Sequence, residues 1–87
     1  MRIVYFAWVR ERLGCDGETV EVPASVVTAG DLATWLGARG GEYAAVFGDM
    51  SRLRIAVDQA MATPDTPITG ATEVAFFPPV TGGVTGG

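Results

Sequence analysis

The chain contains no lysine and no histidine, and Cys15 is its only cysteine. Without histidine it lacks both the commonest general base and the commonest metal ligand of proteins. A single cysteine cannot form an internal disulfide, and it cannot build a zinc site of ordinary ligand spacing. These absences exclude such a zinc site and leave no nucleophile beside a histidine base. An unpaired cysteine also favours a reducing compartment.

A basic stripe and a long apolar run are missing as well. Six arginines stand against ten acidic residues, which gives a net charge of −4. An acidic chain is better matched to bind a basic protein surface than to bind a nucleic acid. The sequence has no 18-residue apolar run, no signal-peptide pattern and no phosphate-binding glycine loop. We therefore expect a cytoplasmic protein that contacts neither nucleic acid nor membrane.

The 87 residues suffice for one small domain with one core. Stretches that are rich in β-branched or aromatic residues, or in which apolar and polar residues alternate, predict strands at 1–9, 19–22, 53–59 and 73–77. Thr28 and Asp31 form the T-x-x-D start of a helix that we expect to run to residue 38. A helical turn at 10–14, a hairpin turn at 15–17 and a short helix at 42–47 complete the expected elements.

This order predicts an α+β fold with one main helix on one face of a mixed sheet. The first and last strands are apolar on both faces, so we expect them to form the central pair. Alternation along the first strand places Ile3, Tyr5, Ala7 and Val9 on one face, and Val4, Phe6 and Trp8 on the other.

Two surface features have alternative interpretations. Phe6 and Phe77 are predicted on the sheet face away from the helix, where with Met61 they would form either an interface or additional core. The run Arg10-Glu11-Arg12 is either a solvated helical turn or the charged edge of an interface.

The last eight residues repeat the sequence VTGG, at 80–83 and at 84–87. The simplest interpretation is a disordered end after the Pro78-Pro79 stop. Alternatively, two glycines without side chains can enter a narrow channel in another protein. A terminal glycine carboxylate is inert until it is activated, for example as an acyl-adenylate. The chain would then be a carrier whose reactive group is its own C-terminus.

The ending FFPPVTGG, at Phe76–Gly83, resembles the C-terminus of the sulfur-carrier subunits of molybdopterin synthases. The start VYFAWVRERLG (Val4–Gly14), the strand RIAVDQ (Arg54–Gln59) and the segment EVAFFPP (Glu73–Pro79) are similar to the same family in the same order. The resemblance therefore covers nearly the whole chain.

This resemblance implies a ubiquitin-like β-grasp domain over residues 1–79 and a flexible C-terminal tail over residues 80–87. It also implies a non-catalytic subunit and a reaction cycle. An adenylating enzyme of the ubiquitin-activating type uses ATP and magnesium to activate the C-terminal glycine, and a sulfur donor converts it to a thiocarboxylate. The large synthase subunit then transfers the sulfur to cyclic pyranopterin monophosphate. The chain itself would hold no cofactor and no metal.

The resemblance further implies which residues act. Gly87 would carry the thiocarboxylate, or Gly83 if the end is trimmed, and Gly82, Gly83 and Gly86 would thread the channel. The large subunit, in a heterotetramer of two large and two small subunits, would contact a larger set: Phe6, Arg10, Met61, Phe77, Pro78, Pro79 and Val80.

The chain departs from the family pattern in two places. It continues past Gly83 to Gly87, which adds about 13–14 Å of extended reach. It also has Asp58 where the family often has Asn. Two other classes stay open: a carrier for thiamine or tRNA thiolation or a ubiquitin-like protein modifier, and a binding module with an idle tail.

Overall fold

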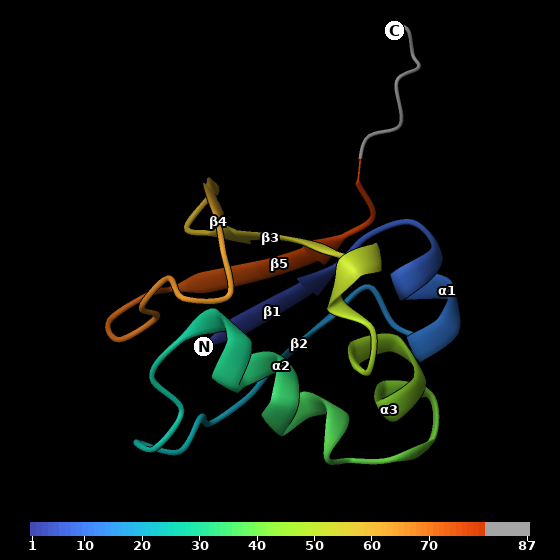
Figure 1. The fold of residues 1–87 in the computed structure, drawn as a ribbon, viewed down its shortest axis with the longest axis horizontal. Helices are drawn as coiled ribbons and strands as arrows, with labels where there is room; N and C mark the ends of the chain where they lie inside the picture. The colour runs from blue at the N-terminus through green and yellow to red at the C-terminus, as the bar shows by residue number, and fades with distance from the viewer. Residues whose placement is uncertain (80–87) are drawn as a thin grey trace, which may run out of the picture.

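A computed structural model describes residues 1–79, which form a five-stranded mixed sheet with its helices on one side (Figure 1). The strand order is β2-β1-β5-β3-β4. The elements follow the chain as β1 (Arg2–Tyr5), α1 (Trp8–Leu13), β2 (Gly17–Thr19), α2 (Ala29–Gly37), α3 (Gly41–Phe47), the 3₁₀-helix η1 (Met50–Arg52), β3 (Arg54–Val57), β4 (Ala60–Ala62) and β5 (Glu73–Phe77).

Strand β5 lies at the centre of the sheet, between β1 and β3. It pairs with β1 in parallel and with β3 antiparallel, so the predicted central pairing of the first and last strands is confirmed. The inward side chains of this pair are almost completely buried: Ile3, Tyr5, Val74 and Phe76. Their burial against the helices supplies much of the hydrophobic stabilisation of so small a domain.

Helix α2 begins where its sequence predicts. The Thr28 hydroxyl accepts a hydrogen bond from the Asp31 backbone N–H, and the Asp31 carboxylate accepts one from the Thr28 N–H. This reciprocal cap satisfies donors that the first helical turn leaves free. The apolar stripe of α2 enters the core through Leu32, Ala33 and Leu36.

The predicted first strand is wrong beyond residue 5. Strand β1 ends at Tyr5, and Ala7 takes a positive φ of 55° that bends the chain into α1. The Val9 N–H closes this turn by donating to the Phe6 carbonyl. Val9 is buried from the helix, and Trp8 lies partly buried beneath the Arg52 guanidinium, 4.6 Å from its ring. The alternating face assigned to Ala7, Trp8 and Val9 therefore does not exist.

The sheet has one strand more than predicted within residues 1–79. The expected strand at 53–59 ends at Val57, because Asp58 and Gln59 form a two-residue turn in which both φ angles are positive. The turn leads into β4, which the sequence did not indicate. The sheet thus gains a short edge strand.

The region after β1 also differs from the prediction. Strand β2 pairs antiparallel with β1, so the predicted hairpin pairing is confirmed, but the connection between them contains the longer helix α1 and Gly17 already belongs to β2. Strand β2 covers Gly17–Thr19 instead of residues 19–22. The Arg2 guanidinium lies over Gly17, at the place a side chain there would occupy. A Cβ atom there would also lie 2.8 Å from the Ile3 backbone carbonyl oxygen, which cannot move aside as the arginine can, and this explains why glycine suits the site.

A polar cluster on the helix side attaches the edge strand β2 to the rest of the fold. One oxygen of Glu18 accepts hydrogen bonds from the Tyr5 and Tyr43 hydroxyls, both at 2.7 Å. The other oxygen accepts one from Arg39 at 2.8 Å, and the Arg39 guanidinium lies 4.7 Å from the Tyr43 ring centre. The cluster joins β2 to β1, to α3 and to the connection that precedes α3.

The same contacts change the acid–base behaviour of the cluster. Partial burial alone raises the pKa of Glu18, but the hydrogen bonds from Arg39, Tyr5 and Tyr43 outweigh it and bring the pKa below its ordinary value. Burial, followed by the hydrogen bond to Glu18, raises the pKa of Tyr43 to about 12. The cluster therefore consists of an ionised carboxylate and two neutral tyrosines at neutral pH.

Replacing Glu18 should destabilise the domain in a pH-dependent way. Because its folded-state pKa is lowered, ionised Glu18 stabilises the fold above the unfolded-state pKa of about 4.3 and loses this effect as the pH falls through the folded-state pKa. We expect Glu18→Gln to lower the free energy of unfolding by roughly 1–2 kcal/mol at neutral pH, because charge-assisted hydrogen bonds are lost. Urea unfolding of both proteins between neutral and acidic pH measures the difference. A difference that stays constant down to acidic pH would contradict this account.

Candidate functional site

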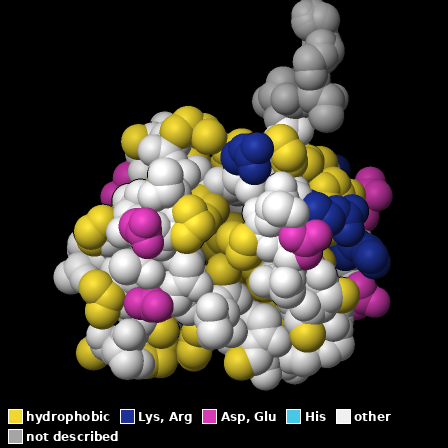
Figure 2. Space-filling view, in the orientation of Figure 1, with side chains coloured by type: hydrophobic (Ala, Val, Ile, Leu, Met, Phe, Trp, Pro, Cys, Tyr) yellow, Lys and Arg dark blue, Asp and Glu magenta, His cyan; other side chains and the backbone are white. Residues whose placement is uncertain are grey.

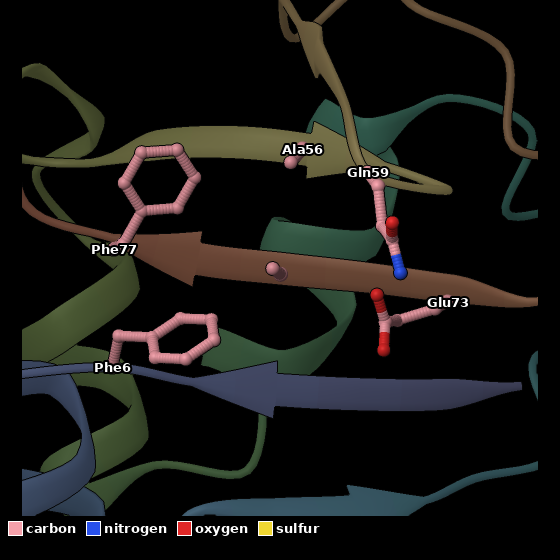
Figure 3. Close-up of a pocket in the computed structure, with 6 residues that line it drawn as sticks. Phe6, Ala56, Gln59, Glu73 and Phe77 are labelled. Atoms are coloured by element: carbon pink, nitrogen blue, oxygen red, sulfur yellow. The ribbon is translucent and has the colours of Figure 1, made fainter.

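The sheet face opposite the helices carries an open hollow with a volume of about 600 Å³ (Figure 3). Alternation along the central strand produces it, since Val74 and Phe76 point to the helices while Ala75 and Phe77 point away. Ala56 of β3 is paired with Ala75, so two methyl groups form the floor. The complete lining is Phe6, Ala56, Gln59, Glu73, Ala75 and Phe77.

Phe6 and Phe77 stand together at one end of this hollow, as Figure 3 shows. Phe6 follows β1 and donates its backbone N–H to the Phe76 carbonyl, which fixes it beside the end of β5. Its side chain is 48% exposed although it is large and apolar. The structure thus places both rings on the face predicted for them. Their contact with a partner stays a prediction.

Of the other two residues predicted to contact a partner, Met61 lies on the open face and Arg10 lies on helix α1. Met61 pairs with Ala56 across β3 and β4, so it shares the open face, and it is 69% exposed. Arg10 is exposed on α1, which lies beside the end of β5 (Figure 1). Figure 2 shows arginine side chains gathered at the edge of the molecule where α1 lies. Arg12, also on α1, forms an ion pair with Glu42 of α3 at 3.6 Å, and both side chains are largely exposed. Because α3 covers the other side of the sheet, this ion pair lies on the helix side and not on the open face.

Pro78 and Pro79 follow β5 directly and are partly buried. The remaining predicted site residues lie outside the described part of the chain: Val80, Gly82, Gly83, Gly86 and Gly87. Within residues 1–79 no three His, Cys, Asp or Glu side chains group as metal ligands would. No helix of this part has the length and apolar character needed to cross a membrane.

The sequence reasoning missed the charged residues of the open face. Arg54 is paired with Phe77 across β3 and β5, and alternation puts it on the same face as Ala56. Glu73 and Gln59 point toward each other at the opposite end of the hollow (Figure 3). Alternation alone indicates that Arg54 and Ala56 share a face, but only the strand register shows which end of the hollow each charge occupies.

Asp58 fixes the Glu73 end of the hollow. Its Oδ1 atom accepts hydrogen bonds from the backbone N–H groups of Thr72 and Glu73, each at 2.9 Å. Its own N–H donates to the Glu73 carbonyl at 2.8 Å. This clamp ties the turn between β3 and β4 to the start of β5. The side chain at position 58 thus makes a structural contact through its acceptor oxygen, which an Asn would also supply.

A model described as the ThiS family matches residues 3–83. The chain belongs to this family. The sequence resemblance to sulfur carriers and the β-grasp fold predicted from it are both confirmed.

Two relatives of this ThiS-family chain carry the same name. The molybdopterin synthase sulfur carrier subunit of Escherichia coli (strain K12) is 40% identical over 95% of this chain and 99% of its own length. The corresponding subunit of Haemophilus influenzae is 29% identical over the same shares of both chains.

Two solved structures have a fold similar to that of this chain. The crystal structure of SAMP1 from Haloferax volcanii has a TM-score of 0.71 and is 26% identical, covering 93% of this chain and 96% of its own. A candidate molybdopterin converting factor subunit 1 from Pyrococcus furiosus has a TM-score of 0.68 and is 25% identical, covering 91% and 95%.

In this ThiS-family chain we expect the stability of variants at position 58 to depend on whether they keep an acceptor oxygen for the Asp58 clamp. Asp58→Asn keeps an acceptor oxygen and tolerates the positive φ, so its free energy of unfolding should stay within about 0.5 kcal/mol of the parent. Asp58→Ala removes the acceptor and strains the turn, and it should cost roughly 1–2 kcal/mol. Urea unfolding of the three proteins compares them. Equal losses in both variants would show that the charge, and not the acceptor oxygen, maintains the clamp.

Proposed function

We propose that this chain is the sulfur-carrier subunit of a molybdopterin synthase. The observation that carries the proposal is the 40% identity to such a subunit over almost the full length of both chains. The apolar open face beside the end of β5 supports it, because it gives a partner a docking surface at the end of the strand after which the Gly-Gly sequence follows in the chain. Within residues 1–79 the site has no nucleophile paired with a base, which suits a carrier whose chemistry takes place on its partners.

The chemistry begins at the terminal carboxylate. One carboxylate oxygen attacks the α-phosphorus of ATP on an adenylating enzyme, forming the acyl-adenylate and releasing pyrophosphate. Sulfur from a donor then displaces AMP and leaves a thiocarboxylate. In the large synthase subunit this sulfur attacks cyclic pyranopterin monophosphate, and the carrier leaves with a carboxylate after water supplies the oxygen. Two such transfers supply the two sulfurs of the dithiolene. ATP and magnesium belong to the activating enzyme.

The docking surface follows from the geometry of the open face. Phe6 and Met61 are exposed and Phe77 is partly buried, and together they present apolar surface that a monomer seldom leaves open. Arg10 is exposed on α1, beside the end of β5, where a charge contributes to orientation and to the rate of encounter. Pro78, Pro79 and Val80 then lead toward the channel of the large subunit, and Gly82, Gly83 and Gly86 pass through it. Gly87 carries the sulfur, or Gly83 does after trimming.

Intact-mass spectrometry tests the carrier assignment. The chain is incubated with its adenylating enzyme, ATP and a sulfur donor, and the C-terminus is then fragmented. Exchange of one oxygen for sulfur adds about 16 Da, and we expect this gain on Gly87. The same gain on a chain shortened to Gly83 would assign the working end to Gly83.

A chain built to end at Gly83 is the matched control. If it gains sulfur while the full chain does not, the second VTGG blocks activation. If neither chain gains sulfur, the carrier assignment is wrong and the binding-module interpretation takes its place. Sulfur gain followed by transfer only to a thiamine precursor, a tRNA or a protein would assign the chain to one of the sibling carriers.

Docking can be tested with two exposed apolar residues of similar exposure. Phe6 is 48% exposed on the open face, and Val27 is 46% exposed beside the start of α2. Phe6→Ala should weaken binding to the large subunit by about ten- to a hundredfold, because aromatic anchors dominate interfaces of this kind. Val27→Ala should leave the affinity unchanged. Titration calorimetry measures both. Equal affinities of the two variants would remove the open face from the interface.

A further inference from the structure

We propose that the open sheet face also binds a second copy of this chain, with the strands of the two copies running in opposite directions. The inference rests on two properties of the face taken together, its relief and its distribution of charge. It goes beyond the carrier function, and it concerns the chain without its partners.

The relief of the face is complementary to itself. Phe6 and Phe77 form a ridge at one end, while Ala56 and Ala75 leave the middle hollow (Figure 3). A two-fold axis that crosses the strands at the level of these alanines places the alanines of the two copies over each other. The aromatic ridges of the two copies then lie at opposite ends of the interface, and each ridge covers the Glu73 and Gln59 end of the other copy. A two-fold interface of this kind uses one surface patch twice.

The charges of the face follow the same symmetry. Arg54 lies at the ridge end, because it is paired with Phe77. Glu73 and Asp58 lie at the other end, joined through the Asp58 clamp. The two-fold rotation places Arg54 of one copy over Asp58 and Glu73 of the other, so opposite charges meet at both ends. A parallel arrangement would instead bring both Arg54 residues to one end of the interface and both Glu73 residues to the other, so like charges would gather at each end, which costs energy.

The remaining charge on the face lies to one side. Arg2 is paired with Glu73 across β1 and β5, but its guanidinium lies over Gly17 of β2, on the far side of β1 from β5. No ion pair within 4 Å joins Arg2 to Glu73 among the described residues. Glu73 thus keeps its carboxylate available to a facing arginine.

Sedimentation velocity of the full chain tests the proposal without any partner protein. We expect the average mass of the parent to rise between about 20 μM and 1 mM, the range in which small interfaces dissociate. Arg54→Glu alone should remain monomeric there, because Glu then faces Asp58 and Glu73. The double variant D58N/E73R should also remain monomeric, because Arg54 then faces a new arginine.

The decisive measurement is an equimolar mixture of R54E with D58N/E73R. In the antiparallel pair each end then joins opposite charges, so the mixture should form dimers although neither variant does so alone. Both variants keep a negative net charge, since the chain starts at −4, and attraction between whole molecules does not explain such pairing. The matched control is Arg12→Glu, which makes the same charge change on the helix side and should dimerise like the parent.

Two results would overturn the proposal. One is a parent chain that sediments as a monomer at every concentration. The other is a parent that dimerises while the mixture stays monomeric, which would assign the contact to another face or another arrangement. Urea unfolding of each variant checks that it remains folded, and the concentration dependence of the parent needs no variant at all.

Discussion

The parallel pairing of β1 with β5 is the contact on which the rest of this fold depends. It places the first and last described strands side by side in the middle of the sheet, although most of the chain separates them. Their inward residues Ile3, Tyr5, Val74 and Phe76 form the centre of the core. Strand β3 adds to the other side of β5, and α2 and α3 cover the apolar face that results. Long-range pairing of this kind stabilises the fold only after a costly loop closure.

The same pairing also produces the open face that we propose as the docking surface. Because side chains alternate along a strand, burial of Val74 and Phe76 directs Ala75 and Phe77 to the opposite side. One strand thus contributes both to the core and to the docking surface, and it leads without a linker into Pro78-Pro79. Stability and recognition are therefore properties of the same five residues, and a change that shifts the register of β5 would damage both.

The sequence predicts those elements whose signals are local. The bounds of β5 were predicted correctly because Pro78 ends a strand, and the start of α2 because Thr28 and Asp31 cap a helix. The end of β1 was missed because Trp8 and Val9 are apolar in a strand and in a helix alike. Strand β4 was missed because its turn uses positive φ angles at two residues that are not glycine.

The residues of the candidate site likewise fall into those that a local sequence pattern predicts and those that depend on strand pairing. The shared face of Phe6 and Phe77 followed from alternation within each strand, so the sequence predicted it. The opposite positions of Arg54 and Glu73 depend on how β3 pairs with β5, which no local pattern encodes. The role of Asp58 as a clamp depends on a contact with residues 72 and 73, fourteen and fifteen positions along the chain.

The central place of β5 has a consequence for biosynthesis. A ribosome makes this strand after every other described element, so the nascent chain has a gap in the middle of its sheet until translation is nearly complete. A fragment that stops before β5 lacks the inner partner of both β1 and β3 and exposes Ile3 and Ile55. A chain that terminates before β5 therefore does not form the open face proposed for docking, so only a chain translated through β5 would bind a partner there.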